Sequence, residues 1–378
     1  MSPTRREVIK TMVAVGAAPE AVGASRAGVS QSVSAIALPT PRAKALMDAF
    51  GLKYPIFEAP HGNQTSPELC IAVANAGAMG SLAAFIFDSE ETARNAVSKV
   101  RSATKGNFFV NFVLQFGAKE LQATLDAGAP TIEFSWGVPT KAMVAAVRAA
   151  KAKLGIQVVN AESARVALDL GADFLVCQGT EAGGHVEASR GLYETLSIVL
   201  TEAGATPVIA AGGIGNGEGI YKVLAAGASA AALGTRFVAS AESTAHPDYK
   251  RALVAADAKD TALTTCFQDG WPVIHRVLRN RTFTMWETAG CSLPGKRPGE
   301  GDVVATQADG TKVVRYEGTA PRPGFVGTLA DLPMWAGTSV EHIKDLPAAG
   351  ELVGRLWREC EAARSNAKSA PTQDCLRS

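Results

Sequence analysis

From Tyr54 to Leu233 the chain alternates short apolar runs with longer segments whose apolar residues recur every three or four positions. Each short run has four or five residues, which is typical of a strand buried on both faces of a parallel sheet. Eight such runs occur, at residues 55–59, 78–82, 108–112, 131–135, 156–159, 173–177, 207–211 and 230–233. Amphipathic helices are predicted between them, at residues 67–76, 89–101, 118–127, 140–154, 161–170, 192–203 and 217–226. This alternation predicts an α/β protein, a closed TIM (β/α)8 barrel rather than an open sheet.

The pattern changes after Asp257. Residues 262–330 are rich in Gly, Pro, Arg and Thr, and their Trp271 and Trp286 predict packing against the barrel. A helix is expected at residues 351–362. We therefore expect a barrel at residues 41–261, a smaller C-terminal lobe or insertion over the active face at 262–364, and a disordered tail at 365–378.

The first 40 residues are predicted to lie outside the fold. Arg5 and Arg6 stand in a segment that resembles a twin-arginine export signal, followed by a weakly apolar stretch and a small-residue site near Ala35. Such a signal predicts export of the folded protein to the periplasm. The alternative is a disordered leader on a cytoplasmic protein.

Composition excludes several partners. The 378-residue chain has 37 Lys and Arg against 36 Asp and Glu, a net charge of +1, which argues against nucleic acid as a partner. No apolar run is long enough to span a membrane. The six cysteines lack metal-type spacing, so we expect no metal site and mostly free thiols. A disulfide between Cys266 and Cys291, or between Cys360 and Cys375, is left open.

The candidate chemistry begins with the loop after the sixth apolar run, which reads Gln178-Gly-Thr-Glu-Ala-Gly183-Gly184-His185. Two glycines let the backbone approach a flat or anionic ligand closely. Histidine is the side chain whose ordinary pKa lies near neutral pH. This loop is therefore predicted to hold a cofactor and to move a proton.

The last two apolar runs also end in glycine. One leads into Gly212-Gly213 and the other into Gly234-Thr235, about twenty residues apart. In TIM barrels the loops after strands 7 and 8 commonly form a phosphate site from backbone N–H groups. The alternative is that these glycines only make tight turns.

Together, several motifs resemble the nitronate monooxygenase family, also called 2-nitropropane dioxygenase, across residues 54–360. The matching motifs are Glu58-Ala59-Pro60, Val110-Asn111-Phe112, Gln178-Gly179, Glu181-Ala-Gly-Gly-His185, Ala210-Ala-Gly-Gly-Ile214, Gly234-Thr235-Arg236-Phe237 and Ala336-Gly337. They are also shared with the FMN-dependent enoyl-acyl-carrier-protein reductases.

The resemblance implies an FMN-dependent TIM barrel and gives roles to single residues. Ala59, Pro60 and Asn111 would approach the flavin ring, Gln178 would bond FMN, and Gly183 and Gly184 would let the ring lie close. Gly212, Gly213, Gly234 and Thr235 would hold the phosphate. Arg236 is left out, because its side chain is equally expected to face the core or a carboxylate.

His185 matches the family's catalytic histidine, a base toward a carbon acid or a group that binds the anionic nitronate. His61 departs from the family, which usually has methionine there. Its ring either lines the pocket as a second acid or base, or points along the loop to solvent. His275 is left undecided.

The resemblance implies oxidation of alkyl nitronates by O2 to a carbonyl compound and nitrite. Its substrates are then a small molecule and O2, and a homodimer is left open. Three alternatives stand beside it: an NAD(P)H-dependent FMN enoyl-thioester reductase, a non-catalytic flavin-binding protein, and a sugar-phosphate barrel without flavin.

Overall fold

A computed structural model describes residues 36–369, and its core is a barrel of eight parallel strands. The strand order is β1-β9-β8-β6-β5-β4-β3-β2, and a parallel bridge between Phe57 and Met79 joins the first strand to the last. The strands are β1 Ile56–Glu58, β2 Gly80–Ala83, β3 Phe108–Val113, β4 Thr131–Ser135, β5 Lys153–Val158, β6 Phe174–Gln178, β8 Val208–Ala211 and β9 Ala230–Leu233. The predicted TIM barrel is thereby confirmed, with a strand at each of the eight apolar runs.

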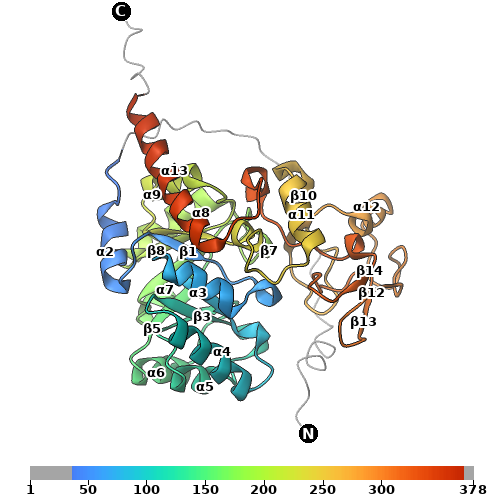
Figure 1. The fold of residues 1–378 in the computed structure, drawn as a ribbon, viewed down its shortest axis with the longest axis horizontal. Helices are drawn as coiled ribbons and strands as arrows, with labels where there is room; N and C mark the ends of the chain where they lie inside the picture. Colours follow the sequence, from blue (N-terminus) through green and yellow to red (C-terminus); the bar gives the residue numbers. More distant parts are fainter. Residues whose placement is uncertain (1–35, 370–378) are drawn as a thin grey trace, which may run out of the picture.

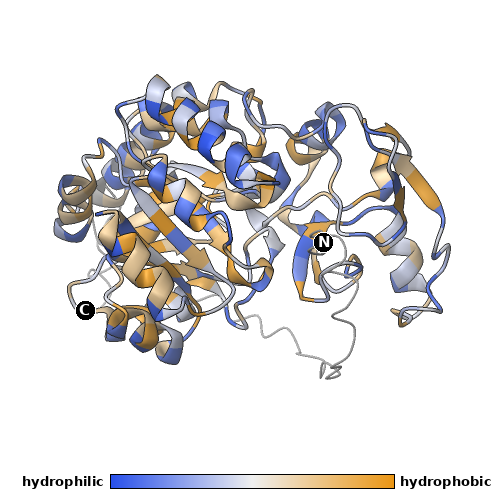
Figure 2. Ribbon diagram, turned by 90° about the horizontal axis from the view of Figure 1, so that it is seen from below, coloured by the Kyte–Doolittle hydropathy of each residue, from blue (hydrophilic) through white to orange (hydrophobic). Residues whose placement is uncertain are grey.

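Helices surround the barrel on the outside (Figure 1). They are α3 Pro67–Asn75, α4 Glu90–Ala103, α5 Leu121–Asp126, α6 Lys141–Ala149, α7 Ala161–Asp169, α8 Leu192–Ala203, α9 Gly217–Ala225 and α13 Ala349–Ser369. The predicted helix at 140–154 was too long, because Lys151 adopts a positive φ of 57° and the chain turns into β5. The strands are coloured mostly as hydrophobic residues, while hydrophilic residues occur along the surrounding helices (Figure 2).

An additional helix, α2 (Pro41–Phe50), lies next to the N-terminal ends of the strands and was not predicted. Leu46 and Phe50 pack in a cluster with Phe57 and Phe174, and the rings of Phe50 and Phe174 meet edge to face at 5.6 Å. The Thr40 hydroxyl caps the helix by accepting from the Ala43 N–H. This helix therefore helps to fill the end of the barrel away from the β6 loop.

The lobe is an insertion between β9 and α13, which differs from the predicted boundaries. The short helix α10 (Thr235–Val238) follows β9 directly, and its Phe237 belongs to the barrel core. The lobe elements are α11 Pro247–Ala255, β10 Thr261–Thr264, β11 His275–Leu278, α12 Arg281–Thr288, β12 Val303–Thr306, β13 Lys312–Val314 and β14 Val326–Gly327. Tyr249 and Leu253 of α11 already pack in the lobe's own apolar cluster, whereas α13 returns to pack on α9 and α3 of the barrel. Helix α13 thus occupies the place of the eighth barrel helix.

The lobe is joined to the barrel through the predicted β6 loop. The two-residue strand β7 (Gly184–His185) pairs antiparallel with β11, His185 opposite His275 and Gly184 opposite Arg276. Trp271 contacts the barrel residues Phe116 and Trp136, as expected. Trp286 does not, because it packs with Phe283 inside the lobe.

The ends of the chain and the cysteines can be compared with the sequence predictions. The twin-arginine segment and Cys375 lie outside the described residues. Helix α13 continues to Ser369, so the first five residues of the predicted tail are helical. All five described cysteines are free, which answers the question of a Cys266–Cys291 disulfide.

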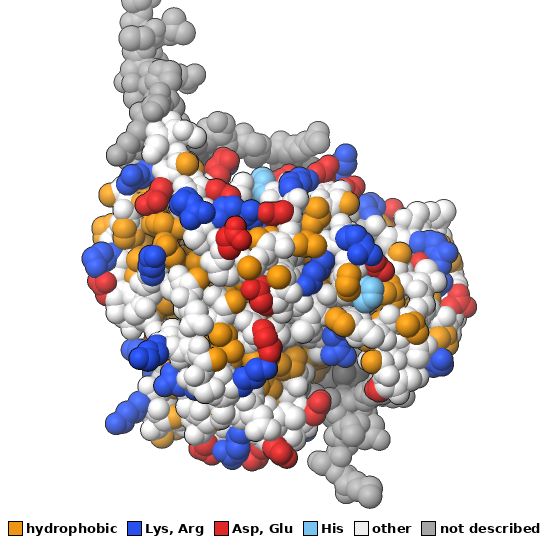
Figure 3. All heavy atoms as spheres, in the orientation of Figure 1, with side chains coloured by type: hydrophobic (Ala, Val, Ile, Leu, Met, Phe, Trp, Pro, Cys, Tyr) orange, Lys and Arg blue, Asp and Glu red, His pale blue; other side chains and the backbone are white. Residues whose placement is uncertain are grey.

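Within residues 36–369, no helix is long and apolar enough to cross a membrane, and no cluster of ligand side chains could hold a metal. On the face shown in Figure 3, positive and negative side chains are interspersed.

Candidate functional site

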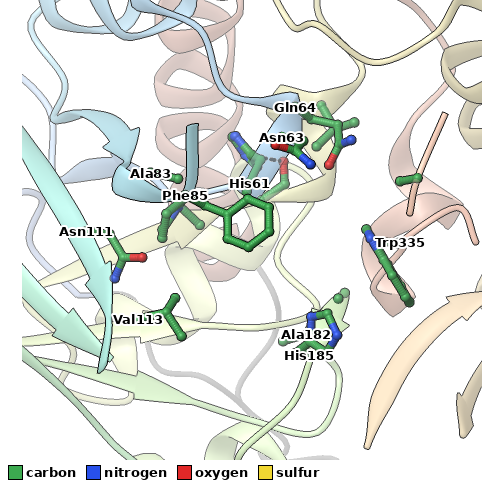
Figure 4. Close-up of a pocket in the computed structure, with 18 of the residues that line it drawn as sticks. His61, Asn63, Gln64, Ala83, Phe85, Asn111, Val113, Ala182, His185 and Trp335 are labelled. Atoms are coloured by element: carbon green, nitrogen blue, oxygen red, sulfur yellow. Dashed lines mark hydrogen bonds between the residues drawn. The ribbon is translucent and has the colours of Figure 1, made fainter. Parts of the chain in front are cut away.

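A cavity of about 870 Å³ opens at the carboxyl ends of the barrel strands and continues under the lobe. This end of a TIM barrel is where active sites are built. All eleven residues selected from the sequence line this one cavity: Ala59, Pro60, Asn111, Gln178, Gly183, Gly184, His185, Gly212, Gly213, Gly234 and Thr235. Asn111 and Phe85 lie on the barrel side, and His185 and Trp335 lie across from them (Figure 4).

The β6 loop is held by its own side chains and by the lobe. The Gln178 amide donates to the His185 carbonyl at 3.3 Å and accepts from the Glu187 N–H at 2.9 Å. A Cβ on Gly183 would lie 2.4 Å from the Gly337 nitrogen, so glycine is required here by the close approach of the 336–338 segment. The sequence interpretation tied Gly183 to the flavin alone. In the structure, Gln178 and Gly183 also fix the loop that carries His185.

The His185 ring faces the cavity and is neutral at physiological pH. Burial, and to a smaller extent the neighbouring His275, lowers the pKa of His185 to about 3. Its ring stacks on Trp271 with centroids 4.2 Å apart and lies 5.1 Å from the Trp335 ring. Among the described hydrogen bonds, none uses either ring nitrogen of His185. Both nitrogens are therefore available to a ligand.

His275, undecided from the sequence, is fully buried in β11. Its Nε2 accepts from the Phe267 N–H at 3.2 Å, so Nδ1 carries the proton and donates to the Val273 carbonyl at 3.0 Å. Burial lowers the pKa of His275 to about 4. Both ring nitrogens serve the lobe backbone, so His275 is a structural residue behind His185.

Two buried carboxyl groups in the cavity wall were not recognised from the sequence as site residues. Glu133 on β4 accepts from the Asn111 amide at 3.1 Å, and burial raises the pKa of Glu133 to about 7. The same amide donates to the Ser135 hydroxyl at 3.0 Å, so Asn111 presents only its carbonyl oxygen to a ligand. A charged residue between Ile132 and Phe134 in a predicted buried strand was the available signal.

The second carboxyl, Glu58 at the end of β1, faces His61. Glu58 Oε1 lies 3.5 Å from His61 Nδ1, and Glu58 Oε2 accepts from the Ser81 N–H at 3.0 Å. His61 Nε2 donates to the Gly234 carbonyl at 3.1 Å (Figure 4). Burial raises the pKa of Glu58 well above its usual range and lowers that of His61 to about 4. The His61 ring thus lines the pocket, with both nitrogens directed at the protein.

The ends of β8 and β9 form the predicted phosphate region. Gly213 has a φ of 70°, and a Cβ there would come within 3.0 Å of Glu181 and Thr338. The Thr235 hydroxyl accepts from the Gly337 N–H at 3.0 Å and keeps its own proton to donate. Arg236 points away, toward Asp345 at 3.1 Å. The donors here are backbone N–H groups and a hydroxyl, a set that fits a phosphate.

The chain is similar to known proteins over most of its length. The nitronate monooxygenase family model matches residues 43–120 and 115–359. A nitronate monooxygenase from Pseudomonas aeruginosa is 31% identical over 360 residues, covering 82% of this chain and 97% of the relative.

Two solved structures are also similar. A nitroalkane oxidase from Streptomyces ansochromogenes has a TM-score of 0.68 and 28% identity, covering 85% of this chain and 99% of its own. FabK from Thermotoga maritima has a TM-score of 0.69 at 24% identity, covering 85% and 97%, a likeness that shows the fold alone. The chain belongs to the nitronate monooxygenase family and is an oxidoreductase with its fold.

Proposed function

We propose that this protein uses bound FMN to oxidise alkyl nitronates with O2, and that His185 acts directly on the substrate. Two nitronate anions and one O2 give two carbonyl compounds and two nitrite ions, which balances atoms and charge. In each nitronate the C=N bond breaks and a C=O bond forms with one oxygen atom from O2. Family membership and the similarity to a nitroalkane oxidase support this class of substrate.

The observation that carries the proposal is the state of His185. A neutral imidazole with two unengaged nitrogens faces a cavity at the catalytic end of the barrel. A neutral ring can accept the proton from the carbon next to a nitro group, which makes the nitronate. As the anion forms, its negative charge stabilises the protonated ring. General-base catalysis of this kind contributes about 10²–10⁴-fold to a rate.

The cavity residues fit FMN. The N–H groups at Gly213 and Gly234 and the Thr235 hydroxyl would hold the phosphate, and the Asn111 carbonyl oxygen would accept from an N–H of the flavin ring. When bound, FMN would supply the electron transfer between nitronate and O2. The protein would orient the substrate, exclude water beneath the lobe and hold the proton on His185.

The test is an absorbance spectrum of the purified protein, followed by separate anaerobic additions of ethane nitronate and NADH. Flavin bands that change on addition of nitronate, with nitrite released once air is admitted, are the expected result. Reduction by NADH alone would favour the enoyl-thioester reductase. A colourless protein that cannot be reconstituted with FMN would contradict the whole proposal.

His185→Asn separates a catalyst from a flavin-binding protein. We expect the variant to keep its flavin spectrum and to lose about 10²-fold or more in nitroalkane turnover. His342→Asn is the control, because its ring lies on the surface. Equal turnover by wild type and His185→Asn would assign the histidine a structural role.

Periplasmic export is also proposed, on the basis of the leader alone. Cell fractionation of the full chain, with and without Arg5→Lys and Arg6→Lys, tests it. Periplasmic protein that becomes cytoplasmic in the double variant is the expected outcome.

A further inference from the structure

Five aromatic side chains lie around the mouth of the cavity, and His185 links one of them to the other four. We call them the aromatic rim: Phe85, Phe116, Trp136, Trp271 and Trp335, all of which line the cavity. Phe85 and Phe116 follow β2 and β3, and Trp136 follows β4. The other two come from the lobe, so the barrel and the lobe each supply part of the rim.

Phe85, Phe116, Trp136 and Trp271 are joined by direct ring contacts, and Trp335 is joined to them through His185. Phe85 and Phe116 meet at 5.6 Å between centroids, Phe116 and Trp271 at 4.8 Å, and Trp136 and Trp271 at 4.6 Å. Trp271 stacks on His185 at 4.2 Å with a tilt of 31°, and Trp335 lies on the other side at 5.1 Å. These edge-to-face and tilted geometries are the preferred ones for aromatic pairs. The Trp271 indole shows that a flat ring can pack against the His185 ring.

Four of the five rim side chains lie outside the hydrophobic clusters, and Trp335 packs against the edge of two clusters of the lobe. All five are half-buried, whereas Phe57, Phe112, Phe174 and Phe237 in the barrel core are less than 2% exposed. Each of the five lines the cavity. An apolar lining of this kind lowers the free energy of a ligand that buries its own apolar surface there.

Trp136 provides a second, independent observation. Its φ is 57°, in the left-handed region that bulky side chains rarely adopt. Such strained residues cluster where a site requires a particular side-chain direction. In this strained conformation the Trp136 indole packs against Trp271.

Charge at the mouth favours an uncharged substituent. Lys312 is the only Lys or Arg among the described lining residues, and its ammonium group bonds the Thr306 hydroxyl at 3.1 Å. The carboxylate of Asp269 is held by both terminal nitrogens of Arg297, at 2.9 and 2.8 Å. A substrate with a second anionic group would therefore have few cationic side chains to bind at the mouth of the cavity.

We propose that the aromatic rim binds the carbon substituent of the substrate, and that the preferred substrates are nitronates bearing an aryl or similarly flat, uncharged group. This inference rests on the proposed function, because it requires the reacting end of the nitronate to lie beside His185. The substituent then extends from His185 along Trp271 and Trp335. Each contact between a rim ring and an aryl substituent should raise the affinity about 2- to 13-fold, in addition to the effect of the apolar area that is buried.

The kinetic test compares kcat/KM for the nitronates of phenylnitromethane and nitroethane. We expect wild type to favour the aryl substrate by about tenfold or more. Trp271→Leu should lower this ratio by about 2- to 13-fold, whereas Trp271→Phe, which keeps a ring, should retain most of it. Trp286→Phe is the matched control, since Trp286 packs inside the lobe away from the cavity, and its ratio should equal that of wild type. A wild-type ratio of one or less, a preference for a carboxylate-bearing nitronate, or an unchanged ratio in Trp271→Leu would overturn the proposal.

A binding experiment distinguishes failure of this inference from failure of the proposed function. Phenylacetate and acetate carry a planar anionic group with two oxygens, as a nitronate does, and need no turnover. Their affinities can be followed by tryptophan fluorescence in wild type and Trp271→Leu. Stronger binding of phenylacetate, weakened in Trp271→Leu, supports the aromatic rim even if no nitronate is oxidised. Equal affinities for the two acids would overturn the rim's role even if nitronates are oxidised.

Discussion

The neutral state of His185 has a measurable consequence for stability. Histidine has an ordinary pKa of about 6.5 in an unfolded chain, and in the folded protein the pKa of His185 is lowered to about 3. Because the pKa of His185 is lower in the folded protein, the His185 ring binds a proton more readily in the unfolded chain. Acid therefore favours the unfolded state, and the folded protein loses stability as the pH falls below about 6.5.

The magnitude at pH 5 follows from the unfolded chain alone. Protonation of an ordinary histidine at pH 5 lowers the free energy of the unfolded state by about 2 kcal/mol, while folded His185 stays neutral. Any folded pKa below about 4 gives the same figure, so the prediction does not depend on the exact value. His185→Asn removes this penalty. The difference in unfolding free energy between variant and wild type should therefore move by about 2 kcal/mol in favour of the variant between pH 8 and pH 5.

Urea unfolding of the flavin-free protein at both pH values measures this difference. Other titrating groups contribute equally to wild type and variant and cancel, apart from those in contact with His185. His342→Asn, on the surface, should show a constant offset. A constant offset for His185→Asn as well would mean that the pKa of His185 in the folded protein equals its unfolded value of about 6.5. That result would refute the lowered pKa of His185 from which the prediction is worked.

Three further predictions concern the scaffold of the site. Gly183→Ala should destabilise the protein by about 1–3 kcal/mol in thermal or urea unfolding, because its Cβ would lie 2.4 Å from the Gly337 nitrogen; unchanged stability would show that the two loops separate freely. Leu46→Ala should cost about 2–5 kcal/mol through the cavity left at the end of the barrel, and a cost below 1 kcal/mol would show that α2 is dispensable. Burial raises the pKa of Glu133 to about 7, so the folded protein holds this proton more tightly than the unfolded chain does. The resulting contribution to the free energy of unfolding is complete below about pH 4.5 and is lost as the pH rises through 7. Glu133→Gln should therefore gain about 2–3 kcal/mol over wild type between pH 5 and pH 8, and parallel pH curves would contradict this.

The barrel strands could be predicted because burial on both faces leaves a signature in the strand itself. A run such as residues 230–233 is short, apolar and bounded by turn residues, and it became β9 with the same bounds. Helix α2 was missed because its apolar positions precede the first strand and adjoin a segment assigned to the leader. The partner of α13 could not be predicted, since nothing local indicates that it packs on α9 after a long insertion.

In the candidate site too, some features could be predicted from the sequence and others could not. Loops that follow strands in a barrel must gather at one end, so the eleven selected residues could be brought together by topology alone. The aromatic rim could not be assembled in this way, because it joins Phe85 and Phe116 to Trp335 across more than half of the chain. The direction of His61 is likewise set by Gly234, 173 residues away.

The Glu58–His61 pair explains how the cavity tolerates histidine at this position beside an anion site. The Gly234 carbonyl can only accept, so His61 Nε2 carries a proton, and a neutral ring then leaves Nδ1 as an acceptor. Nδ1 and the facing Glu58 Oε1 have no other hydrogen-bond partner among the described residues. Burial raises the pKa of Glu58 and lowers that of His61, so both shifts favour an uncharged pair with the shared proton on Glu58. The neutrality of the pair matters for the binding of an anion. Lys312 is the only Lys or Arg among the described lining residues and comes from the lobe, so the barrel supplies no cation to the lining that would offset an ionised Glu58. An ionised Glu58 would place a buried negative charge near the backbone donors at Gly234, where it would oppose the binding of a phosphate.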